Sequence, residues 1–177
     1  MARDTSLTGV ARTFSSSDII VSKTDTKGRL TYTNQTFLEL AGYTEAECIG
    51  APHSKIRHPD MPRCIFKLLW DTISKGDEIF AYVVNRSKNG DHYWVLAHVT
   101  PTFDTSENIV GYHSSRRVPS QSALAAVIPL YAKLKTEEDR HSDRKAGLEA
   151  SEAMLNGILN DASMAYDQFI FSVINAK

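Results

Sequence analysis

The chain has 177 residues, of which 42% are hydrophobic and 23% charged, and its formal net charge is -1. These values are ordinary for one soluble domain with an appendage. A balanced charge gives no overall field that would attract nucleic acid or an anionic membrane, so neither is an expected partner. No apolar run approaches the roughly 20 residues that cross a bilayer. The two cysteines have no C-x-x-C spacing, so we expect no disulfide framework and a cytoplasmic location.

The first third of the chain predicts an arm, a hairpin and a helix. Residues 1–17 are polar and rich in serine and threonine, which is typical of a flexible or loosely docked arm. Residues 18–23 and 29–33 are short, β-branched or alternating segments around a turn, so they predict a β-hairpin. Asn34 is the expected N-cap of the next helix, because its side chain can accept from first-turn amides, and Gly42 ends that helix.

The middle of the chain predicts further helices and then strands. A short helix is expected from Thr44 to Gly50, and three prolines prevent one long helix between residues 51 and 62. From Met61 to Lys75 apolar residues recur with a helical period. An Asn-Gly turn typical of hairpins joins the first two of the strands that follow. These three strands are expected over residues 79–86, 93–103 and 109–116. The order of elements predicts an α+β fold, a five-stranded antiparallel sheet with short helices on one face.

A helical tail is expected to follow this domain. Pro119 separates residues 18–119 from an extension over residues 120–177, whose first helix should bend at Pro129. Apolar residues then repeat every seven positions from Leu148 to Phe169, which predicts a helix that pairs with a partner or a second copy. A helix folded back on its own domain would produce the same pattern.

The densest polar cluster is the run Arg57-His58-Pro59-Asp60. A cation, an imidazole and a carboxylate in four residues can bind a phosphate or the rim of a heterocycle. The alternative is a turn in which Asp60 caps the following helix and Arg57 is solvated. The spacing of His53 and His58 is a weak metal-ligand signal, because prolines interrupt the segment. No nucleophile, phosphate-loop or zinc-protease motif is present, so we do not expect an enzyme.

Aromatic residues gather on the long helix and the last strands, at Trp70, Phe80, Tyr82, Tyr93, Trp94 and Phe103. Most of them belong to an ordinary core. A planar cofactor between helix and sheet would need such a lining together with a few polar anchors. Asn34 and Asn85 can supply amide donors and acceptors for that purpose.

Two runs carry a family resemblance, Ile56-Arg57-His58-Pro59-Asp60-Met61-Pro62 and Asn85-Arg86-Ser87-Lys88-Asn89-Gly90-Asp91-His92-Tyr93-Trp94-Val95. With Gly42-Tyr43-Thr44 they resemble PAS domains, most closely the FAD-binding PAS domains of bacterial aerotaxis receptors, over residues 18–135. The resemblance implies FAD between the sheet and the helices. It also implies a sensor of redox, oxygen or energy status, which signals in chemotaxis or another pathway through a partner protein or a homodimer.

The family's flavin-binding positions match this chain at Asn34, Arg57, His58, Asp60, Trp70 and Asn85. The resemblance implies that Asn85 hydrogen-bonds the polar edge of the flavin ring and that Trp70 packs against the ring or the adenine. Arg57 and His58 would meet the pyrophosphate or the ribityl chain. Asp60 would orient Arg57 or cap the helix, and Asn34 would hold the entry of its own helix.

The sequence departs from the family in two respects, and it also lacks a motif of light-sensing relatives. Ile79-Phe80-Ala81 stands where the family often has Trp-x-Gly, which affects ring packing or redox tuning. The receptors' membrane anchor and signalling hairpin are lacking, so we expect output through another protein or through the tail. The cysteine motif of light-sensing relatives is absent. Two alternatives stay open: a haem-binding PAS gas sensor with His53 or His58 as axial ligand, and a cofactor-free dimerisation module.

Overall fold

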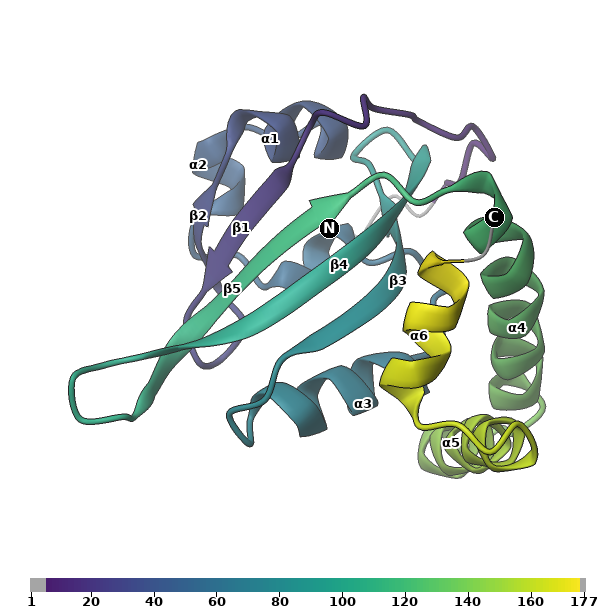
Figure 1. Ribbon diagram of the computed structural model, residues 1–177. Helices are drawn as coiled ribbons and strands as arrows, with labels where there is room; N and C mark the ends of the chain where they lie inside the picture. Colours follow the sequence, from purple (N-terminus) through teal and green to yellow (C-terminus); the bar gives the residue numbers. More distant parts are fainter. Residues whose placement is uncertain (1–5, 176–177) are drawn as a thin grey trace.

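A computed structural model describes residues 6–175. Its centre is a five-stranded antiparallel sheet with the strand order β2-β1-β5-β4-β3 (Figure 1). The strands are β1 (Ile20–Thr24), β2 (Leu30–Thr33), β3 (Ile79–Arg86), β4 (His92–Phe103) and β5 (Ile109–Arg117). The predicted α+β class, a sheet with helices and a helical tail, is therefore confirmed.

Four short helical segments cover one face of the sheet, which we call its inner face. They are α1 (Gln35–Ala41), α2 (Glu45–Cys48), the 3-10 helix η1 (His53–Ile56) and α3 (Arg63–Ile73). The α1 helix begins as predicted, because the Asn34 side chain accepts from the amide of Phe37. The α3 helix begins after Pro62 without a side-chain cap, so Asp60 does not cap it.

The inner face of the sheet is largely apolar because β4 alternates strictly. Tyr93, Val95, Ala97 and Val99 are buried, whereas the residues between them are partly exposed. Asn85 of β3 pairs directly with Tyr93 and therefore shares that face. The register thus places one buried amide among hydrophobic side chains.

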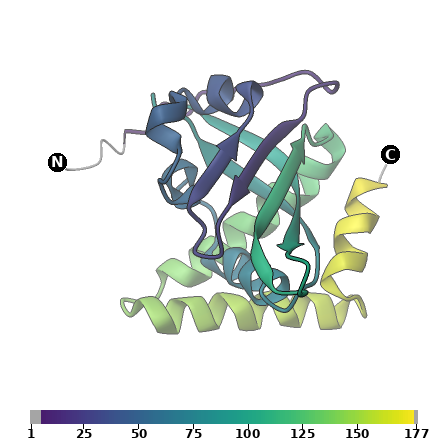
Figure 2. The same ribbon diagram turned by 90° about the vertical axis from the view of Figure 1, so that its left-hand side faces the viewer.

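The tail forms three helices, α4 (Gln121–Asp139), α5 (Arg144–Asp161) and α6 (Tyr166–Ile174). The expected single helix from Leu148 to Phe169 is instead two helices, because the chain turns after Ala162, whereas pairing of the tail with a partner stays a prediction. Ser163 adopts a left-handed conformation with φ 51°, and the amide of Met164 donates to the carbonyl of Leu159. The tail folds back on its own domain, with α5 beneath α3 and α6 beside β3 (Figure 2).

The tail also covers the edge of the sheet. β3 is an outer strand, and the hydroxyl of Tyr131 on α4 donates to the carbonyl of Tyr82, with 2.8 Å between the oxygens. On the outer face, Phe171 of α6 packs against Phe80, with ring centroids 5.3 Å apart. Covering an edge strand in this way satisfies groups that would otherwise be open to another chain.

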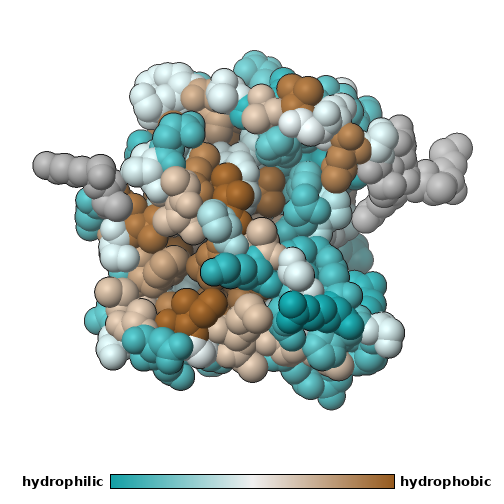
Figure 3. All heavy atoms as spheres, turned by 90° about the vertical axis from the view of Figure 1, so that its right-hand side faces the viewer, coloured by the Kyte–Doolittle hydropathy of each residue, from teal (hydrophilic) through white to brown (hydrophobic). Residues whose placement is uncertain are grey.

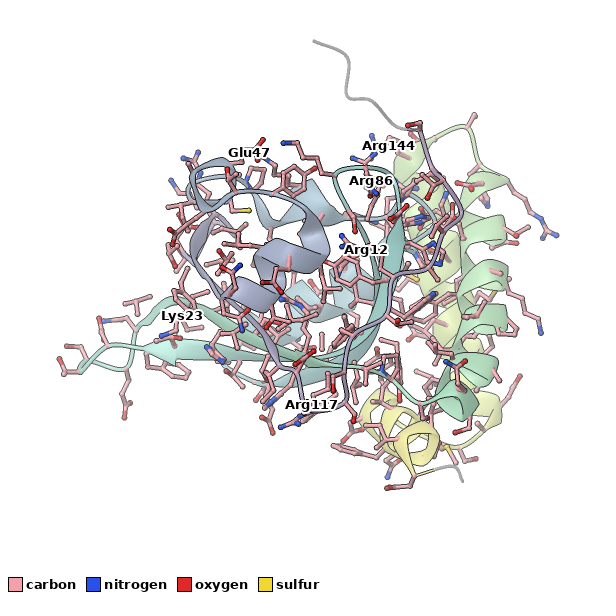
Figure 4. The ribbon with its side chains drawn as sticks, turned by 90° about the horizontal axis from the view of Figure 1, so that it is seen from above. Arg12, Lys23, Glu47, Arg86, Arg117 and Arg144 are labelled. Carbon is pink, nitrogen blue, oxygen red and sulfur yellow. The ribbon has the colours of Figure 1, made fainter. Side chains whose placement is uncertain are left out.

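The described part of the arm, residues 6–17, docks on the β3–β4 hairpin. The amide of Arg12 donates to the carbonyl of His92, and the amide of His92 donates to the carbonyl of Val10. The Arg12 guanidinium also donates to the carbonyl of Leu40 (Figure 4). Residues 1–5 of the predicted arm lie outside the described residues. Within those residues, no helix has the length and apolar character that crossing a membrane requires.

Candidate functional site

A cavity of about 340 Å³ lies between the inner face of the sheet and the segment from η1 to α3. Its wall combines strand residues with residues of η1, α3 and the β1–β2 turn. The residues are Thr24, Lys27, Gly28, Pro52, His53, Ser54, Arg57, Phe66, Lys67, Leu69, Trp70, Ile73, Asn85, Ala97, Val99, Tyr112, Ser114 and Arg116. The volume is at the lower end of the roughly 300–1,000 Å³ typical of ligand pockets.

Three of the six predicted site residues, Arg57, Trp70 and Asn85, line this cavity. Arg57 follows η1, and its backbone forms an isolated antiparallel bridge with that of Asn85. Trp70 projects from α3 and meets Tyr112 of β5 edge-on, with ring centroids 5.4 Å apart. Its ring also lies against Gly28, where a Cβ would approach it to 3.1 Å. Trp70 thereby closes the space between α3 and the β1–β2 turn.

The other three predicted residues do not line the cavity. The Asn34 side chain accepts from the amides of Val21 and Phe37 and donates to the carbonyl of Ile19, so it joins β1 to α1. His58 is buried and accepts at Nδ1 from the amide of Asp60. The Asp60 carboxylate is exposed and lies 3.7 Å from the same Nδ1. A cofactor role for these three residues remains a prediction.

The most deeply buried cation of the cavity wall is Arg116 of β5, which no motif in the sequence identifies. Its Nη2 donates to Nε2 of His53 over 2.6 Å and to the hydroxyl of Ser22 over 2.9 Å. Burial lowers the pKa of Arg116 to about 10, and burial and the nearby Arg116 lower the pKa of His53 to about 3. His53 is therefore neutral and accepts at Nε2. No carboxylate in the described chain forms an ion pair with Arg116, so this buried cation is uncompensated.

Three buried polar atoms on the cavity wall lack a hydrogen-bond partner. They are Nδ2 of Asn85, Oγ of Ser114 and Nη1 of Arg116. A buried polar group without a partner costs about 1–3 kcal/mol, and native proteins rarely leave such groups unpaired. Two of the atoms are donors, and a hydroxyl can donate as well. The wall therefore fits a flat ligand with acceptor atoms at one edge and apolar faces, as a flavin ring has.

The same geometry bears on the haem alternative. His53 reaches the cavity, but its Nε2 already accepts the hydrogen bond from Arg116. His58, the other candidate axial ligand, does not line the cavity. Among the described residues, no group of three or more histidine, cysteine or acidic side chains is placed to hold a metal ion. In this cavity, therefore, Nε2 of His53 is already engaged and His58 is not in place to serve as a ligand of haem iron.

Comparisons with known proteins agree with this architecture. Residues 30–116 match the family described as PAS fold. The aerotaxis receptor of Escherichia coli (strain K12) is 44% identical over 115 residues, which is 65% of this chain and 22% of the receptor. The nitrogen fixation regulatory protein of Klebsiella pneumoniae is 23% identical over 99 residues, 56% of this chain and 20% of that protein. The chain thus spans about a fifth of the length of these curated relatives.

Solved structures show the same fold. The dark structure of the blue-light photoreceptor Aureochrome1 LOV has a TM-score of 0.53 and 26% identity, and the match covers 68% of this chain and 84% of that one. The PAS domain of the fruit-fly ELK potassium channel has a TM-score of 0.51 and 18% identity, over 56% of this chain and 85% of that one. The sheet, the helices over its inner face and the cavity between them have the PAS fold, and residues 30–116 of this chain form a PAS domain.

Proposed function

We propose that the cavity binds FAD and that the domain senses redox, oxygen or energy status and signals to a partner protein or through a dimer. The observation that carries the proposal is the set of unpaired polar atoms at Asn85, Ser114 and Arg116, on a wall that also offers apolar and aromatic surface. The 44% identity to an aerotaxis receptor supports a sensory role. The family resemblance supports FAD as the cofactor. The relatives' names describe a receptor and a regulatory protein rather than enzymes.

The cavity residues divide into anchors and packing groups. Asn85 and Ser114 offer hydrogen bonds to the polar edge of the ring, and Phe66, Leu69 and Trp70 offer apolar contact. A bound flavin supplies a ring whose reduction changes its protonation and its charge. Arg116 favours negative charge in the cavity, because a buried cation without a carboxylate partner is stabilised by an anion. His53, held neutral, fixes the direction of the Arg116 guanidinium.

A route from the cavity to the tail runs along β3. Asn85 and Tyr82 lie three residues apart on this strand, and Tyr82 accepts the hydrogen bond from Tyr131 of α4. A change in the hydrogen bonding of Asn85 is thereby coupled to a contact of the tail, which provides the two linked sites that allostery requires. Hydrophobic side chains gather on the face that carries α4 and α6 (Figure 3). Ile128 is 43% exposed and Phe171 44% exposed on these helices, and they offer a surface to a partner or a second copy.

The absorption spectrum of the purified chain, oxidised and then reduced, tests the cofactor. We expect broad blue bands that bleach on reduction, and heat followed by chromatography should release intact FAD. A Soret band would favour the haem sensor. A colourless protein that takes up no flavin on incubation with FAD would favour the cofactor-free module. Either result would contradict the proposal.

A further inference from the structure

A second cavity, of about 420 Å³, lies where the start of α3 meets the end of α4 and the start of α5. Its wall consists of Arg57, Pro59, Met61, Arg63, Lys135, Glu138, Asp139, His141 and Arg144. Four permanent cations against two carboxylates leave an excess of two positive charges in this wall. Figure 4 shows Arg144 at the start of α5, on the helical side of the molecule and away from Lys23 on the sheet.

The two carboxylates of this cavity are already engaged. Glu138 is buried and accepts from Nε of Arg63 over 2.7 Å and from the Arg63 amide over 2.8 Å. Asp139 is ion-paired with Lys135. Arg57 and Arg144 have no ion-pair partner in the described part of the chain. Burial lowers the pKa of Arg57, and the charges of Arg63 and Arg144 lower it further while Glu138 raises it. These cations therefore share one positive region that an anion would stabilise.

Arg57 belongs to the walls of both cavities. Its guanidinium lies over the ring of Phe66, 4.3 Å from the centroid, and Phe66 lines the first cavity. Its Nη2 donates to the carbonyl of Met61, which lines the second. One half-buried cation thus borders both cavities. The first cavity, of about 340 Å³, suits the three-ring heterocycle of FAD, so the rest of the dinucleotide would extend beyond it.

We propose that the second cavity binds the diphosphate of the flavin cofactor, with Arg144 and Lys135 of the tail acting beside Arg57 as phosphate ligands. This inference rests on the proposed function, because it takes the ring to lie in the first cavity. Arginine guanidinium groups and lysine ammonium groups both bind phosphate oxygens through charge-assisted hydrogen bonds. The tail then has a second role, since it completes the site that distinguishes a dinucleotide from riboflavin.

The test compares riboflavin with FAD on the full chain, freed of cofactor, by titration of flavin fluorescence. FAD is expected to bind at least about tenfold more tightly than riboflavin. This difference in affinity should become smaller as the salt concentration rises. Arg144→Ala should weaken FAD binding about ten- to a hundredfold and leave riboflavin binding unchanged. Lys135→Met should act in the same direction. Lys145→Ala is the matched control, because Lys145 neighbours Arg144 on α5, has an 83% exposed side chain and does not line the cavity.

The outcomes separate this inference from the proposed function. A chain that binds neither flavin refutes both. A chain that binds riboflavin and FAD equally keeps the flavin proposal and overturns this one. If, in addition, inorganic diphosphate binds the riboflavin-loaded protein, the second cavity holds a free anion instead. Equal losses of riboflavin and FAD in Arg144→Ala would assign that residue a structural role and would also overturn the inference.

Discussion

Arg116 is a buried cation whose partners, His53 and Ser22, are both neutral. An ion taken out of water without a counter-charge costs several kcal/mol, which a ligand with acceptor atoms would offset. Within the cavity, therefore, one residue both destabilises the empty domain and favours a bound anion or carbonyl group.

Arg116→Met is expected to have opposite effects on folding and on binding. It removes the buried charge and keeps the apolar stem, so the cofactor-free protein should be at least as stable as the wild type in urea unfolding. Flavin affinity should fall by about tenfold or more, because a charge-assisted hydrogen bond is lost. The exposed neighbour gives the control, Arg117→Met, which should change neither quantity (Figure 4). Unchanged flavin affinity in Arg116→Met would remove Arg116 from the site.

His53 predicts a loss of stability in acid. Its pKa is lowered from 6.5 to about 3 by burial and by Arg116, so between these values the unfolded chain binds a proton that the folded chain does not. The free energy of unfolding should therefore fall as pH falls through this window, by about 1.4 kcal/mol per pH unit at most for this ring. Burial also lowers the pKa of His58 and His113, so a residual slope will remain without His53.

The measurement is urea unfolding of the cofactor-free protein at several pH values between 4 and 7. His53→Asn should have a shallower dependence than the wild type, since asparagine does not titrate. Parallel curves for the two proteins would mean that the ring is not held neutral in the folded chain.

Between elements, α5 approaches the end of α4 closely at Gly147. A Cβ on this residue would lie 2.3 Å from the carbonyl oxygen of Glu138 and 3.3 Å from the Arg63 guanidinium. The same helix contains Gly157, where a Cβ would meet nothing within 4 Å. The two positions share a helical backbone and differ in their surroundings.

Alanine at these two positions should change stability in opposite directions. Gly147→Ala forces α4 and α5 apart and should destabilise by about 1–3 kcal/mol, the usual cost of overpacking. Gly157→Ala should stabilise by about 0.5–1 kcal/mol, because alanine is the better helix former. Denaturant unfolding of both variants measures these changes in the free energy of unfolding. If Gly147→Ala also stabilises, the close packing of α5 on α4 is not present in solution.

At the level of elements, local residue patterns predict the structure correctly where they fix the backbone conformation. The cap at Asn34 and the Asn89-Gly90 turn are such signals, and the strands and helices around them lie close to the predicted ranges. The break between α5 and α6 has no local signal, since neither glycine nor proline occurs from Ala162 to Ala165. There the apolar stripe follows tertiary packing, with α5 against α3 and α6 against β3.

The candidate site was only partly predictable for a related reason. Arg57, Trp70 and Asn85 stand in motifs that the family resemblance identifies. Ser114 and Arg116 belong to a run of consecutive polar residues in β5, and which of them face inward depends on the pairing of β5 with β1 and β4. This register also depends on β1, which is distant from β5 in sequence, so no short window of the sequence reveals it.

For the whole molecule, the tail is expected to be an integral part of the fold. Leu155, Leu159, Ile170 and Val173 are buried, and each buried side chain of this kind contributes roughly 1.5–3 kcal/mol. Deleting residues 146–177 should therefore lower the free energy of unfolding by at least about 4 kcal/mol. A deletion of residues 163–177 should give a smaller loss, because it keeps α5.

Thermal unfolding and mass in solution of the two truncated chains test this expectation. If the chain without residues 146–177 melts at the same temperature as the full-length chain, the tail is not docked on the domain. Loss of a dimer on truncation, with flavin retained, would instead assign the tail to pairing between copies, as the seven-residue repeat predicts.

The hydrogen bond from Tyr131 to the Tyr82 carbonyl has a consequence for assembly. If a signal moved α4 and α6 away, β3 would present its outer backbone groups around Tyr82 to solvent, whereas Arg57 would still pair with Asn85. Two copies in that state could extend one sheet into the other, edge to edge, through main-chain hydrogen bonds that do not depend on side-chain identity. Tyr131→Phe, which removes only the hydroxyl, should therefore raise the tendency to self-associate before it measurably changes the secondary structure.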